Sequence, residues 1–184
     1  MSTPPDVNKL LETSYMKSLG SFIDLFSIVE NLVKRLMAHF AGVDEPTALA
    51  LFSGVRTDQA IANIRRLHQA RKAELDPALD AALQQMAVIT NFRNDLLHHR
   101  VDFTKTPPVT TNRAVVLSEN AVRETVIGPD TLMDAGHDLG RIILILGVFL
   151  SDTRDGADLE WALSEPWRHK PPSQPRKHLR PIED

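Results

Sequence analysis

The sequence predicts a mainly α-helical protein, a small up-down bundle of four to five helices with one small β-hairpin and an extended C-terminal tail. The main observation is that apolar residues recur at spacings of three and four over most of the chain. A second observation is that β-prone runs occur in one region only. The 184 residues, 42% of them hydrophobic and 24% charged, suit one folded domain.

The first helix is expected from about residue 7 to 41. Gly20 is a candidate break that would divide it in two, and Gly42 is a candidate C-cap. Its apolar stripe predicts a core face, made of Phe22, Leu25, Phe26, Val29, Leu32, Val33, Leu36, Met37 and Phe40. A short apolar turn follows Glu45 and Pro46.

The next helix is expected to open at residues 57–59 (TDQ), an N-cap sequence, and to end near Lys72. Its polar side carries a basic strip, for which a solvated face and a phosphate-facing surface are both open readings. The strip consists of Arg65, Arg66, His68, Arg71 and Lys72.

Two further long helices begin at proline signals. Asp76 followed by Pro77 predicts a helix that runs to about residue 100, roughly 37 Å in length. Residues 128–130 (GPD) open the last helix, which closes near Asp152. Its apolar run at 142–150 is too short for a bilayer, which needs roughly 20 residues, so a buried core helix and no membrane span are expected.

Residues 102–112 are expected to form a loop because Pro107 and Pro108 disfavour regular structure. The β-prone runs 113–117 and 122–127 predict the hairpin, which would pack on the helices. The domain is expected to span 7–156, after a flexible arm at 1–6. The Pro-rich basic tail, 157–184, has five prolines and five Lys or Arg between 166 and 182 and is expected to be extended and largely disordered; it either solubilises the chain or contacts nucleic acid or a partner.

Composition limits the chemistry. The absence of cysteine excludes disulfides, thiol catalysis and Cys-based metal sites, and is compatible with a cytoplasmic protein. The N-terminus has no basic segment followed by an apolar one, which argues against a secretory signal. A net charge of −3 and 5% aromatic residues argue against a global nucleic-acid-binding field or an extended stacking surface. Any contact with RNA is therefore expected to be local.

The densest group of reactive side chains lies at 91–100 (NFRNDLLHHR), near the end of the Asp76 helix. Arg93, Asn94 and His98 match the pattern R-N-x-x-x-H, and this helix thereby resembles the motif helix of HEPN domains. The resemblance implies a small helical domain that dimerises. It also implies either a metal-independent endoribonuclease with no cofactor, often the toxin of a toxin–antitoxin pair, or an inactive module that binds a nucleotide, RNA or a protein.

The residue types suit that chemistry. Metal-independent cleavage of RNA needs a base near the 2′-hydroxyl and positive charge near the phosphoryl oxygens. His98 can exchange a proton near neutrality, and Arg93 can hold phosphate with two hydrogen bonds. The supporting candidates are Asp95, His99 and Arg100.

Helix geometry gives an independent reason to expect a dimer. Asn94 and His98, four residues apart, share a face, so the amide could orient the imidazole. Arg93 and His98 are separated by about 140° around the helix and about 7.5 Å along it. One helix converges them poorly, whereas a two-fold dimer would bring two arginines and two histidines into one cleft.

Two other readings of this stretch are open. Cationic residues favour helix C-termini, so His98, His99 and Arg100 could simply stabilise the helix end, with Arg93 paired to Asp95 or Asp102. The alternative chemistry is a metal-dependent phosphohydrolase in which Asp95, His98 and His99 join His137 and Asp138 as ligands. His137 and Asp138 are expected near the surface of an amphipathic helix.

Overall fold

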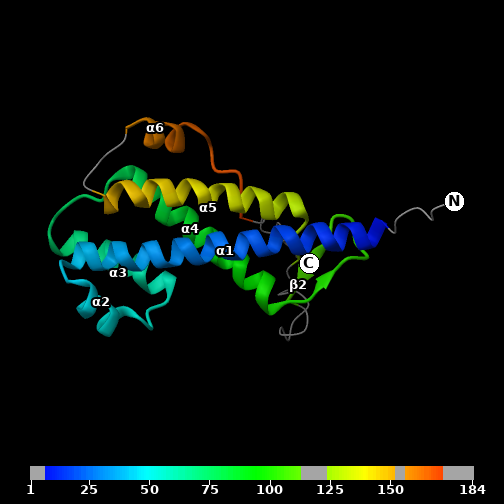
Figure 1. The fold of residues 1–184 in the computed structure, drawn as a ribbon, viewed down its shortest axis with the longest axis horizontal. Helices are drawn as coiled ribbons and strands as arrows, with labels where there is room; N and C mark the ends of the chain where they lie inside the picture. The colour runs from blue at the N-terminus through cyan, green and yellow to red at the C-terminus, as the bar shows by residue number, and fades with distance from the viewer. Residues whose placement is uncertain (1–6, 113–123, 152–155, 172–184) are drawn as a thin grey trace, which may run out of the picture.

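The computed structural model describes residues 7–112, 124–151 and 156–171, which form six helices and a small sheet. The bundle is built on three long helices: α1 (Val7–Ala41), α4 (Pro77–His98) and α5 (Pro129–Leu150). Figure 1 shows α1 and α5 side by side and running in the same direction, with α4 crossing in the opposite sense. The predicted small helical bundle is confirmed.

The sequence signals for helix ends act as predicted. Asp76 accepts a hydrogen bond from the Ala78 amide (2.8 Å) and starts α4, with Pro77 in its first turn. Gly42 ends α1 with a φ of 71°, a backbone conformation that favours glycine. α3 (Thr57–Ala70) also begins where the sequence placed it.

Two expectations about the first 52 residues are wrong. Gly20 does not divide α1, which continues for 35 residues, because one glycine costs only about 1 kcal/mol and the helix packs along its length against α5. The segment expected to be a turn is a helix, α2 (Glu45–Phe52), because the Asp44 side chain caps it by accepting from the Thr47 amide (3.0 Å).

The sheet contains three antiparallel strands in the order β1 (Val101–Asp102), β2 (Val109–Thr111) and β3 (Glu124–Val126). The predicted second strand agrees with β3, whereas the first, at 113–117, lies outside the described residues. The expectation of a plain loop at 102–112 is wrong. The prolines at 107 and 108 precede β2 instead of interrupting it, so Thr110 can pair with both Val101 and Thr125.

The core lies between the long helices and includes the predicted stripe of α1 in large part. Phe22, Phe26, Val29, Val33, Leu36 and Met37 are all buried. α6 (Gly156–Ser164) lies over α5 at the far side of the bundle from α2 (Figure 1). No helix in the described ranges is long and apolar enough to cross a membrane.

The chain that follows α6 is extended, as its prolines predict, but it is not free. Residues 165–171, called the strap below, return along the bundle, and His169 is only 4% exposed. The expectation of a largely disordered tail is therefore wrong for this part, and 172–184 lie outside the described residues.

Candidate functional site

The sheet is anchored to the last turn of α4, where the R-N-x-x-x-H motif lies. The Thr125 hydroxyl donates to Asp95 (3.2 Å), and the Thr110 hydroxyl donates to the backbone carbonyl of Arg100 (3.3 Å). Both threonines are buried. The Asp95 side chain therefore helps to hold β3 against the motif helix.

Arg93 is half-buried and makes an incomplete set of contacts. Its guanidinium carbon lies 5.4 Å from the centre of the buried Phe26 ring, and one terminal nitrogen donates to the Asn94 side-chain oxygen (3.3 Å). Its Nε is buried with no hydrogen-bond partner. Arg93 forms no ion pair with the described acids, so pairing with Asp95 or Asp102 is excluded there. Within the described part of the chain, its charge therefore has no acidic partner.

His98 is exposed on the last turn of α4 and forms no hydrogen bond or ion pair with the described part of the chain. Asn94 does not orient it as the sequence suggested, since its side-chain oxygen accepts from Arg93 instead. Asn94 and His98 still lie on the same face of α4, because they are four residues apart. The imidazole is free to meet another molecule.

The remaining motif residues lie at the helix end. His99 is half-buried and is the C-cap of α4, with extended backbone, and Arg100 is exposed. Asp102 follows, and the hydrogen bonds it accepts from Thr104 lower the pKa of its carboxyl, with smaller contributions from Lys105 and Arg100. This geometry is compatible with His98 and Arg100 stabilising the helix C-terminus, as the capping reading requires.

The motif residues do not line the surface hollow between α1 and α5. A surface hollow of about 330 Å³ lies between α1 and α5, and its lining includes Lys17, Phe22, Leu25 and Met133 but no motif residue. Arg93 is held inward on Phe26, whereas His98 projects from the exposed end of the helix. The side chains of Arg93 and His98 therefore diverge in the folded chain, as helix geometry predicts.

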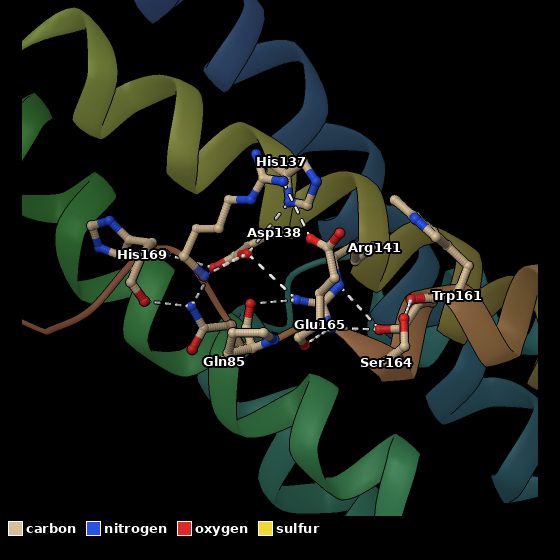
Figure 2. Close-up of polar contacts among 11 residues, drawn as sticks. Gln85, His137, Asp138, Arg141, Trp161, Ser164, Glu165 and His169 are labelled. Atoms are coloured by element: carbon tan, nitrogen blue, oxygen red, sulfur yellow. Dashed lines mark hydrogen bonds and ion pairs between the residues drawn. The ribbon is translucent and has the colours of Figure 1, made fainter.

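A second polar cluster, deep between α4 and α5, was not anticipated (Figure 2). The carboxylate of Asp138 is fully buried and accepts from the Gln85 side chain (2.8 Å) and from the backbone amides of Arg168 (3.1 Å) and His169 (2.9 Å). Gln85 also donates to the His169 carbonyl (2.8 Å). This cluster fastens the strap to both helices.

Arg141 completes the cluster, one helical turn from Asp138. Its guanidinium is 2% exposed, donates to the carbonyls of Ala162, Glu165 and Pro166, and lies 4.2 Å from the Trp167 ring centre. It therefore satisfies the carbonyls at the end of α6. The sequence carried a signal for this cluster, because Asp138 and Arg141 interrupt an otherwise apolar helix face.

This geometry argues against the metal reading. Asp138, expected near the surface, is buried and its oxygens are occupied by three donors. No group of three or more His, Asp or Glu side chains suited to a metal ion occurs among the described residues.

No family model, curated protein or solved structure matches this chain.

Proposed function

We propose that this protein is a HEPN-like, metal-independent endoribonuclease whose active site forms between two copies of the chain. The observation that carries the proposal is the state of the two central side chains. Arg93 keeps an uncompensated charge and an unpartnered Nε, and His98 is exposed and unbonded within the described chain. Within the described residues neither side chain is paired with an acid, whereas Asp95 accepts a hydrogen bond from Thr125.

In the proposed reaction His98 of one copy removes the proton from an RNA 2′-hydroxyl. The resulting oxygen attacks the adjacent phosphorus, and the 5′-oxygen leaves with a proton from the imidazolium, which gives a cyclic phosphate on one fragment and a 5′-hydroxyl on the other. Arg93 of the second copy holds the phosphoryl oxygens as their charge rises. The two-fold arrangement supplies the convergence that one helix lacks.

A non-catalytic module is the alternative, in which the same surface binds a nucleotide, RNA or an antitoxin-type protein partner. One observation favours it: Asn94 is bonded to Arg93 and leaves the imidazole without an orienting partner. A base that is not oriented catalyses less well than one that is held.

The test compares RNA cleavage by the wild type and by His98→Ala, with EDTA present. The proposal predicts cleavage in EDTA and a loss of about 100-fold or more in His98→Ala, the usual contribution of a general base. The matched control is His39→Ala, because His39 is also an exposed histidine in the last turn of a long helix. If the wild type leaves diverse RNAs intact but binds them, the non-catalytic alternative replaces the proposal.

A further inference from the structure

The strap is the part of the fold that one titrating group could release. It has no regular secondary structure and is held by the Asp138 carboxylate, the Gln85 amide and the guanidinium of Arg141. These contacts use the backbone of the strap, so they do not depend on its side chains. Two of its side chains also pack inward, Trp167 on Arg141 and His169 on Phe92.

The His169 imidazole occupies an environment that fits only its neutral form. Its ring centre lies 4.4 Å from that of the buried Phe92, and the residue is 4% exposed. Its Nε2 atom is buried and has no hydrogen-bond partner. A protonated imidazole has two N–H donors, so protonation would leave at least one charged donor buried and unpaired.

We propose that the strap is an acid-released latch, in which protonation of His169 detaches residues 165–171 from α4 and α5 while the helical bundle stays folded. Detachment places the imidazolium in water and uncovers Phe92, the residue before the motif's Arg93. The proposal is independent of the proposed nuclease activity, because it concerns only how the strap is held.

The electrostatics around His169 give the expected direction. Burial lowers the pKa of His169 below its ordinary value of 6.5, and the carboxylates of Asp138 and Asp134 on α5 oppose this only in part. From α4 the ring meets the uncharged Phe92, and Gln85 bonds its carbonyl. Within the strap Arg168 pairs with Glu165 (3.2 Å). The carboxylates of Asp138 and Asp134 therefore reduce the lowering of the His169 pKa by burial but do not cancel it.

The lowered pKa of His169 determines how docking of the strap depends on pH. The detached strap binds a proton more readily than the docked strap, so docking is strongest above pH 6.5 and weakens as the pH falls. In that window the docking equilibrium constant should fall about tenfold for each pH unit, until the docked form is also protonated. A second histidine lies close to the carboxylate that holds the strap: His137 Nδ1 on α5 is 3.8 Å from Asp138 and is buried without a hydrogen-bond partner.

The experiment follows fluorescence and acrylamide quenching of Trp167 between pH 7.5 and 4.5, in a Trp161→Phe background that leaves one tryptophan. Wild-type strap should become more quenchable below pH 6.5 while far-ultraviolet circular dichroism keeps its helical signal. His169→Phe retains the ring against Phe92 and the backbone bond to Asp138 but cannot be protonated, so it should remove the transition. The matched control, His68→Phe, replaces a histidine of α3 that packs on Phe40 of α1, and this variant should keep the transition.

Three results would overturn the latch. The quenching could stay constant across the pH range, the transition could persist in His169→Phe and so belong to another group such as His137 or a carboxylate, or helix could be lost together with the strap. None of these results bears on RNA cleavage, which the His98 experiment tests separately.

Discussion

At the scale of single residues, the fold divides its polar side chains into those that are satisfied internally and those that are not. Asp138 and Arg141 are buried and make several hydrogen bonds each, whereas Arg93 and His98 do not complete theirs within the described chain. Such a difference is expected if Asp138 is structural, and it is the basis for proposing the motif pair as a functional surface.

The role of Asp138 can be tested through stability. Asp138→Ala removes the acceptor for three donors, namely one N–H of Gln85 and the backbone amides of Arg168 and His169. We expect the free energy of unfolding to fall by about 3 kcal/mol, measured by urea denaturation at neutral pH. Asp24→Ala, at an exposed position of α1, is the control and should change it by less than about 0.5 kcal/mol. Equal stability of the two variants would contradict a structural role for the cluster.

At the scale of elements, the long helices were predictable because their signals are local. The Asp76–Pro77 start, the Gly42 end and the apolar stripe of α1 depend on neighbours within a few residues. The continuity of α1 through Gly20 was not predictable, because it depends on packing against α5, far away in the sequence. β2 was missed for the same reason, since its three residues gain stability only from partners on either side.

Gly20, inside α1, and Gly42, directly after its end, provide a matched pair with opposite expectations. Neither has an atom within 4 Å of an added methyl group, so only backbone conformation distinguishes them. Gly42→Ala forces alanine into a left-handed conformation and should lower the free energy of unfolding by about 1 kcal/mol. Gly20→Ala lies within the helix and should raise it by about 0.5 to 1 kcal/mol. Thermal unfolding of both variants checks the signs, and destabilisation by Gly20→Ala would argue against a continuous helix.

At the scale of the whole molecule, the candidate site was only partly predictable from sequence. The motif residues, their place at the end of α4 and the divergence of Arg93 from His98 follow from spacing alone. The contact of Arg93 with Phe26, the use of Asp95 by Thr125 and the packed strap all join residues distant in the chain, so no local pattern revealed them. The second copy of the chain remains part of the proposal and is tested by mixing variants.

The most direct test of the central claim mixes Arg93→Ala with His98→Ala, after each has been purified and found inactive on RNA. If the active site combines Arg93 of one copy with His98 of the other, mixed dimers regain one complete site. At equal concentrations the mixture should then recover about a quarter of wild-type cleavage, since half of the dimers are mixed and each has one of two sites. Recovery of cleavage should require exchange of subunits between the two variants, and light scattering is used to monitor that exchange. A mixture that stays inactive although mixed dimers form, or a wild type that is monomeric and still cleaves RNA, would contradict the shared site.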